Sequence, residues 1–376
     1  MIEKEVSELR RRFRAEKSNI THVLGCYVNE KKEIISRFNQ SLALMSQEET
    51  EKLLTTLRKT LSGTIGKNLL DITFDTRQVV EDDAHKLLMT LRDSALRDDD
   101  AVDTFFRHMI EALEMEGNYM ILLACDAYDV PYRGKDGEVD RDRSGDVFRY
   151  ILCSVCPVKM TKPALSYSAH ENAFHNLDVE WIISAPEAGF LFPAFDDRCT
   201  NLYNALYYTK DIGSIHPEMV RAAFHTEPPM PAATQFEIFH GILEDTLDEE
   251  CSYEVVQAVN DHLRNMVEAN AANKDEQPMA VDKMQVKQVL HNNGVPEQQV
   301  EHFDARYNQA FGEDTALSPR NLVNTRQLEI RTPDVTIRLK PEHQELVETR
   351  IIDGVPYILI RAEDGMEVDG VQVHIS

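Results

Sequence analysis

The sequence contains two apolar runs of strand length, residues 119–125 (YMILLAC) and residues 148–156 (FRYILCSVC). Short apolar runs of this kind, bounded by turn-forming residues, are typical of buried strands. A segment rich in Gly and Asp separates them, so the two runs predict an antiparallel pair joined by a long loop. Residues 180–184 and 190–192 are expected to extend the same sheet, which we place at the centre of the main domain.

Helical patterns accompany this sheet. Residues 46–49 (SQEE) form a capping box, and leucines follow at helical spacing up to residue 61, which predicts a helix. The same spacing predicts helices around residues 87–91 and 105–113, whereas residues 20–28 (ITHVLGCYV) predict a strand. Helices combined with antiparallel strands predict an α+β protein with an antiparallel or mixed sheet.

The second half of the chain has a different character. Between residues 241 and 280 there are ten acidic and two basic residues, and apolar residues recur at helical spacing. Residues 286–311 predict a helix, a turn and a second helix, and the polar stretch 270–279 is the predicted linker. After residue 321, alternating apolar residues and Asp-Gly dipeptides predict hairpins.

We therefore expect three regions. Residues 1–230 form the α+β main domain, residues 231–320 form an acidic helical segment, and residues 321–376 form a small β-rich C-terminal module. A chain of 376 residues is long enough for two or three such domains with buried cores.

The charge of the chain excludes one class of function. Lys and Arg total 40 against 65 Asp and Glu, which gives a formal net charge of −25. Broad, non-specific nucleic-acid binding depends on basic residues that neutralise phosphates, so this composition argues against it. No apolar run approaches the roughly 20 residues of a membrane helix, and the polar start is not a signal peptide. Six scattered cysteines indicate reduced thiols, so we expect a cytoplasmic protein that does not bind a membrane.

Cys153, Cys156, His170 and His175 have the spacing of a Cys2His2 zinc site. Two thiolates and two imidazoles can complete a tetrahedral zinc shell. The cysteine pair, however, lies in a strongly apolar predicted strand, and free cysteine is among the most buried residue types. We therefore favour core thiols and expect neither a metal nor another cofactor, with the zinc site as the alternative.

Asp196, Asp197 and Arg198 directly follow an apolar run, residues 189–195. Carboxylates at the end of a strand can hold a metal or act as acid and base, so these three residues are the candidates for a metal-assisted hydrolase. Asp is also favoured in turns. We favour a turn at this position, and the hydrolase remains the alternative.

Arg10, Arg11, Arg12 and Arg14 form a basic cluster in an otherwise acidic sequence. On a helix, such a cluster could bind phosphates or an acidic partner, or it could neutralise the acidic surface of the protein itself. We take it as the candidate surface for partner binding. A factor that associates with the ribosome or another RNA-bearing machine is a further alternative.

The helix pair at residues 286–311 does not predict sequence-specific DNA binding. A recognition helix presents basic and amide side chains to the major groove. The second helix instead carries Glu297, Glu301 and Asp304 against a single Arg306. We expect a plain pair of antiparallel helices.

Four segments together resemble a family of Firmicutes proteins described as a domain of unknown function. They are residues 61–70, 150–158, 189–198 and 347–354. The resemblance spans most of the chain and implies a bacterial, cytosolic protein, and it brings no reaction, ligand or catalytic residue.

The function we expect rests on the motifs and on the distribution of charge. The sequence contains no complete catalytic motif, and its charge is divided between a basic start and an acidic middle. The sequence therefore favours a non-catalytic binding or regulatory protein that engages a macromolecular partner.

Overall fold

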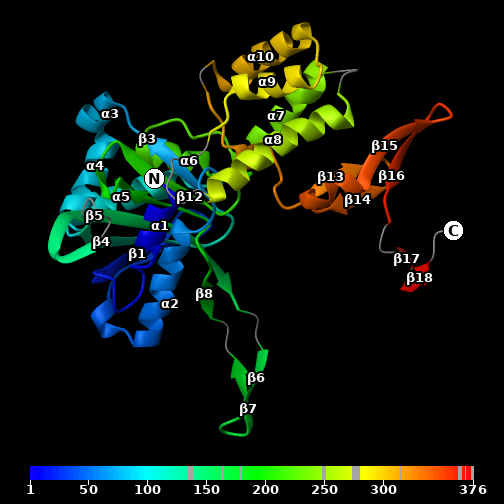
Figure 1. Cartoon of the computed structure of the whole chain (residues 1–376). Coiled ribbons are helices and arrows are strands. Elements are labelled where there is room, and N and C mark those ends of the chain that lie inside the picture. The colour runs from blue at the N-terminus through cyan, green and yellow to red at the C-terminus, as the bar shows by residue number, and fades with distance from the viewer. Residues whose placement is uncertain are drawn as a thin grey trace. The chain divides into compact units, whose positions relative to one another are not determined.

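The computed structural model describes residues 1–133, 139–161, 164–177, 180–247, 251–272, 280–313, 315–362, 366–368 and 370–373. The chain forms two compact units, Met1–Ala233 and Thr234–Ser376 (Figure 1). The first unit is built on an antiparallel sheet with helices, and the second combines helices with small hairpins. The prediction of an α+β protein is confirmed.

An eight-stranded sheet forms the centre of the first unit. Seven strands follow the order β2-β1-β4-β5-β9-β12-β3, and β8 pairs with β5 beyond this path. Their bounds are β1 (His22–Val28), β2 (Ile34–Ser41), β3 (Leu69–Thr73), β4 (Tyr119–Arg133), β5 (Val139–Met160), β8 (Trp181–Ile183), β9 (Ala188–Phe192) and β12 (Asn204–Thr209). Strands β4 and β5 pair antiparallel as predicted, but they run further than expected and take in much of the predicted loop.

Both faces of this sheet are buried along its central strands. Along β5, Ile151, Cys153 and Val155 enter one core, whereas Tyr150 and Leu152 enter the other, as the alternation of a strand requires. The first core is closed by α4 (Asp83–Asp93), α5 (Asp99–Ala112) and α6 (Pro217–Phe224). The second core is closed by α1 (Glu3–Arg10), α2 (Gln47–Arg58) and the 3-10 turn η2 (Lys59–Leu61). The sheet therefore lies between two helical layers.

The predicted helices form, and the capping box predicted for the first of them is present. At the start of α2, Ser46 Oγ accepts a hydrogen bond from Glu49 N (3.2 Å), and Glu49 Oε2 accepts one from Ser46 N (2.8 Å). Helices α4 and α5 begin at the capping residues Asp82 and Asp98. A short helix that the sequence did not reveal, α3 (Thr76–Glu81), precedes α4.

Among the described residues of the first unit, four short strands stand outside the main sheet. Strands β6 (Ala164–Ser168) and β7 (Ala173–Leu177) pair with each other (Figure 1). Strands β10 (Ala194–Asp196) and β11 (Cys199–Asn201) form a second pair. The β10–β11 hairpin adds Ala194 and Phe195 to the second core. The β6–β7 hairpin contributes no described residue to either core.

The second unit begins with helices. They are α7 (Ala232–Leu247), α8 (Tyr253–Ala272), α9 (Lys283–Asn292), α10 (Glu297–Phe311) and α11 (Pro319–Leu322). Their shared core includes Phe239, Leu263, Leu290 and Phe303. Helices α9 and α10 form the expected pair around a turn at Gly294, which has a φ of +82°. Of the predicted linker 270–279, residues 270–272 end α8 and the others lie outside the described residues.

Three hairpins follow, which confirms the β-rich end. They are β13 (Leu328–Arg331) with β14 (Thr336–Leu339), β15 (Val347–Ile352) with β16 (Val355–Ile360), and β17 (Met366–Val368) with β18 (Val371–Val373). Asp353 and Gly354 join β15 to β16 with positive φ values, as the Asp-Gly dipeptide predicts. Throughout the described ranges, every helix is too short or too polar to cross a membrane.

Candidate functional site

The Cys2His2 alternative is wrong because the two thiols point in opposite directions. Cys153 belongs to the first core and Cys156 to the second, on opposite faces of β5, and both are fully buried. Burial raises the pKa of Cys153 well above its ordinary range and that of Cys156 to about 12. His170 is exposed, and His175 Nε2 lies 2.6 Å from Glu171 Oε2. The two cysteines are core thiols, as favoured from the sequence.

Asp197 and Arg198 form the two-residue turn of the β10–β11 hairpin. Their φ values are +49° and +60°, and Asp196 pairs with Cys199 across the turn. Consecutive positive φ values are the geometry of a tight hairpin turn, which Asp tolerates better than most residues. The expected turn is confirmed for Asp197, whose side chain is exposed.

Asp196 and Arg198 have distant partners that the local sequence did not reveal. Asp196 Oδ1 lies 2.7 Å from the α-amino group of Met1, and Arg198 Nη1 lies 2.6 Å from Glu8 Oε2. Burial opposes the charge of the amino group, but Asp71 and Asp196 outweigh burial and raise its pKa. Asp196 and Arg198 thus hold α1 against the β10–β11 hairpin, which supports a structural role rather than acid and base catalysis.

Arg12, one of the four arginines in the candidate partner-binding cluster, is paired within the protein. Its Nε and Nη2 donate to Asp126 at 2.9 and 3.2 Å, and its guanidinium lies 4.5 Å from the centroid of the Tyr128 ring. Asp126 is 1% exposed and also accepts hydrogen bonds from Asn19 N and Tyr150 Oη. Burial disfavours the charged guanidinium, but Asp126 outweighs burial and raises the pKa of Arg12.

The other three arginines of the cluster differ from one another in their exposure to solvent. Arg10 is half-buried and lies 3.5 Å from Glu3, whereas Arg11 and Arg14 are exposed. The basic surface predicted from the cluster therefore consists mainly of Arg11 and Arg14.

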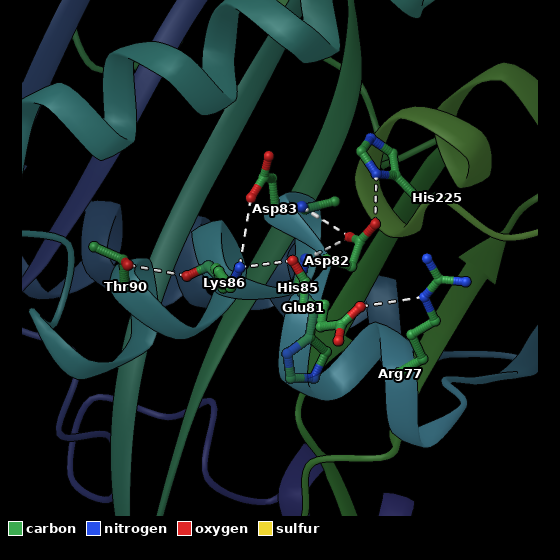
Figure 2. Close-up of polar contacts among 9 residues, drawn as sticks. Arg77, Glu81, Asp82, Asp83, His85, Lys86, Thr90 and His225 are labelled. Carbon is green, nitrogen blue, oxygen red and sulfur yellow. Dashed lines mark hydrogen bonds and ion pairs between the residues drawn. The ribbon is translucent and has the colours of Figure 1, made fainter.

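Asp82 and His225, 143 positions apart in the sequence, form a side-chain hydrogen bond between two helix ends (Figure 2). Asp82 caps α4, since its Oδ1 accepts from Ala84 N (2.8 Å) and His85 N (3.1 Å), and its Oδ2 lies 2.9 Å from His225 Nδ1. His225 ends α6 in the left-handed region, with a φ of +48°. An anion at the start of α4 suits the helix dipole, and its contact with His225 links this end of α4 to the end of α6.

The residues around this pair are typical of a capped helix end rather than of a reaction centre. His85, below Asp82, packs its ring against Phe74 and Phe192, and its Nε2 contacts Leu202 O at 2.9 Å. The ion pairs drawn beside it, Arg77 with Glu81 and Lys86 with Asp83, are solvent-exposed (Figure 2). A cavity of about 340 Å³ lies elsewhere, between the β1–β2 turn and the start of β4.

Asp82→Ala should lower the free energy of unfolding by about 1 kcal/mol, the usual effect of losing an N-cap. Burial opposes the charged carboxylate, but hydrogen bonds from His225, His85 and Ala84 outweigh burial and hold the pKa of Asp82 below its ordinary value. The stabilisation is therefore complete above the ordinary aspartate pKa and is lost as the pH falls through the lower native value. Urea unfolding of both proteins from neutral to acid pH should show the difference shrinking on acidification. A constant difference would contradict this assignment.

The β6–β7 hairpin exposes an apolar face that sequence reasoning missed. Leu165 is 70% and Phe174 68% exposed, and Tyr167 lies directly opposite Phe174 with ring centroids 5.2 Å apart. The opposite face carries the cross-strand pair Ser166 and His175. The signal in the sequence is weak, because Leu165 and Tyr167 alternate with serines before residues 169–172, whereas Phe174 is followed by two polar residues.

Exposed apolar residues continue onto the neighbouring strand β8. Trp181 and Ile182 are each 53% exposed, and the indole of Trp181 contacts Tyr27 edge-on at 6.2 Å. We call Leu165, Tyr167 and Phe174 the apolar hairpin face.

A family model matches residues 1–371, and so takes in both units. The chain belongs to the family described as a domain of unknown function (DUF4317). This membership confirms the resemblance drawn from four segments of the sequence. Among curated proteins, none matches the chain. For a DUF4317 protein, function must therefore be argued from its own residues, and the described part of this one contains no group of three or more His, Cys, Asp or Glu placed to hold a metal.

Proposed function

We propose that the protein is a non-catalytic binding protein whose apolar hairpin face inserts into an apolar cleft of a basic protein partner. The observation that carries the proposal is the exposure of Leu165, Tyr167 and Phe174 on one side of the hairpin, with the polar pair Ser166 and His175 on the other side. Contiguous exposed apolar residues are costly in water and mark interaction sites. Aromatic side chains of this kind are enriched at the centres of protein interfaces.

The charge distribution supports a basic protein as the occupant. Residues 159–183 contain two Lys and three acidic residues, a net charge of −1, so the rest of the chain carries −24 of the total −25. The hairpin region is thus almost neutral, while the remainder attracts cations and repels phosphates over distances near the Debye length. RNA and anionic membranes are disfavoured for the same reason. Arg11 and Arg14 alone are a small basic surface for an RNA-bearing machine.

Location and origin are part of the proposal. All six cysteines are free thiols in the structure, which fits a reducing cytoplasm. The resemblance described above favours an origin in Firmicutes.

Two matched variants test the hairpin. Leu165→Lys with Phe174→Lys places two charges on the apolar hairpin face, whereas Ser166→Lys with His175→Lys places two on the opposite face of the same hairpin. We expect only the first variant to lose a basic protein that the wild type retains after cross-linking in cells. Neither should change the melting temperature by more than about 2 °C, because the substituted side chains lie outside the cores.

The purified partner should then be titrated against the protein while tryptophan emission is followed. Trp181 is the single tryptophan of the chain and is 53% exposed, so its emission reports on this region alone. We expect a blue shift on binding to the wild type and to the polar-face control. Equal retention by all three proteins, or a retained species that nuclease removes, would refute the proposal.

A further inference from the structure

The β15–β16 hairpin exposes apolar side chains that nothing in the described part of the chain covers. Ile351 is 78% and Ile360 57% exposed on one face, and Tyr357 is 46% exposed on the other. Among the described residues from 324 onward, Val347 is the one buried apolar side chain. An isolated two-stranded hairpin is marginal in water, and stability requires a third strand or another apolar surface. The hairpin therefore has apolar surface that a further strand could cover.

One edge of the hairpin is open to another strand. Because Asp353 and Gly354 form a two-residue turn, the first pair of ladder bonds joins Ile352 and Val355, and bonded pairs alternate from there. The bond from Arg361 N to Leu346 O (2.8 Å) fits this alternation. The backbone groups of Val347, Thr349 and Ile351 consequently point away from β16.

Those outward groups receive no backbone hydrogen bond from any described residue. The opposite edge of the hairpin is blocked, because Pro356 is one of the outward-pointing residues of β16 and lacks an N–H. Thr349 Oγ1 donates a hydrogen bond to the Glu254 side chain of α8 at 3.0 Å. This bond joins two side chains, so it uses none of the backbone groups at the edge of β15. The open edge is therefore that of β15.

The sequence of β15 is complementary to itself when two copies run antiparallel. Centred on Thr349, the pairing places Val347 opposite Ile351 of the second copy and Glu348 opposite its Arg350, each contact occurring twice. Apolar residues thus meet apolar ones and opposite charges meet across the strands, the pairs that stabilise a sheet. Within one copy, Arg350 Nε already donates to Glu348 Oε1 at 2.9 Å, so both side chains are oriented along this strand.

We infer that two copies of the chain pair through the edge of β15 about a two-fold axis and form a four-stranded sheet, β16–β15–β15–β16. The interface is isologous, since the same five residues, 347–351, contribute from both sides. A sheet of four strands that gathers Val347, Ile351 and Ile360 of both copies on one face meets the requirement for a third strand. Each whole chain carries a net charge of −25, but the hairpin, residues 347–360, carries only −1. Two copies therefore repel each other little at this part of their surfaces.

Charge reversal distinguishes this pairing from any other association of the full chain. Glu348→Arg places like charges opposite each other twice, as does Arg350→Glu, so each variant alone should dimerise at least about tenfold more weakly than the wild type. Mixing the two variants restores opposite charges at every position, and so does combining both substitutions in one chain. We expect the mixture and the double variant to dimerise like the wild type.

Sedimentation velocity and light scattering at about 0.15 M salt, where the Debye length is near 8 Å, give the mass of each sample. One chain has a mass of 43.0 kDa, and the wild type should reach twice that value in the micromolar range. Lys340→Glu and Glu342→Arg are the matched controls, because both residues are exposed and precede β15. They should leave the dimer unchanged.

Two results would overturn the inference. The first is a wild type that stays at 43.0 kDa up to several hundred micromolar. The second is a dimer that survives both single reversals. Because the apolar hairpin face takes no part in this pairing, Leu165→Lys with Phe174→Lys should still dimerise, and the outcome is independent of the proposed partner.

Discussion

Arg12→Ala should lower the free energy of unfolding by about 3–5 kcal/mol, because it leaves the buried Asp126 carboxylate without a countercharge. Asp126 is 1% exposed and accepts two hydrogen bonds from the Arg12 guanidinium. The remaining donors, Asn19 N and Tyr150 Oη, cannot neutralise it. The loss also removes a cation held over the Tyr128 ring. Thermal and urea unfolding followed by circular dichroism measure the effect.

The same cluster supplies the controls. Arg11→Ala and Arg14→Ala remove exposed charges and should change the free energy of unfolding by less than about 0.5 kcal/mol. Adding Asp126→Leu to Arg12→Ala removes the uncompensated charge and should recover part of the loss. If Arg12→Ala behaved like its neighbours, Asp126 would have to be neutral or hydrated in the native protein.

Gly189→Ala should destabilise the first unit by about 3 kcal/mol, at the upper end of the range for overpacked cores. Gly189 lies in the fully buried strand β9, and an added Cβ would collide with the carbonyl oxygen of Cys153 and lie 2.6 Å from Thr60 Cγ2. The carbonyl belongs to the ladder of the neighbouring strand and cannot move aside. Thr60 is fixed as well, by a 2.6 Å hydrogen bond to Ser154.

Gly25 provides the matched comparison. The three atoms nearest to an added Cβ there all belong to the ring of Phe38, a side chain 37% exposed on the edge strand β2. That ring can swing into solvent, so Gly25→Ala should change the free energy of unfolding by less than about 1 kcal/mol. Equal losses from the two substitutions would show that strand β9 can shift to make room.

The sequence predicted correctly the helices and strands that depend on residues close together in the chain. The capping box at Ser46 and the apolar runs in β4 and β5 formed as expected. Strand β2 was missed because it is an edge strand with no buried residue, so it lacks the apolar alternation on which strand prediction depends. The β6–β7 hairpin was missed because alternation without burial has the same appearance as a polar loop.

The candidate sites show the same limit. The turn at Asp197 follows from residue type, whereas the partners of Asp196, Arg12 and Asp82 lie more than a hundred positions away in the sequence. A carboxylate has the same local appearance whether it caps a helix, holds an amino group or neutralises a buried arginine. The tertiary fold alone selects among these partners, and no periodicity or spacing records that choice.

The order of strands in the main sheet determines how early the first unit can fold while the chain is being synthesised. Strand β3 pairs with β12, where Leu69 faces Tyr208, so this edge of the sheet cannot close until about 140 further residues have left the ribosome. Contacts so distant along the chain make folding slow. Until then the apolar residues of β3 and its neighbours remain open to chaperones. The helix pairs and hairpins of the second unit, joined by short turns, can form as soon as they emerge.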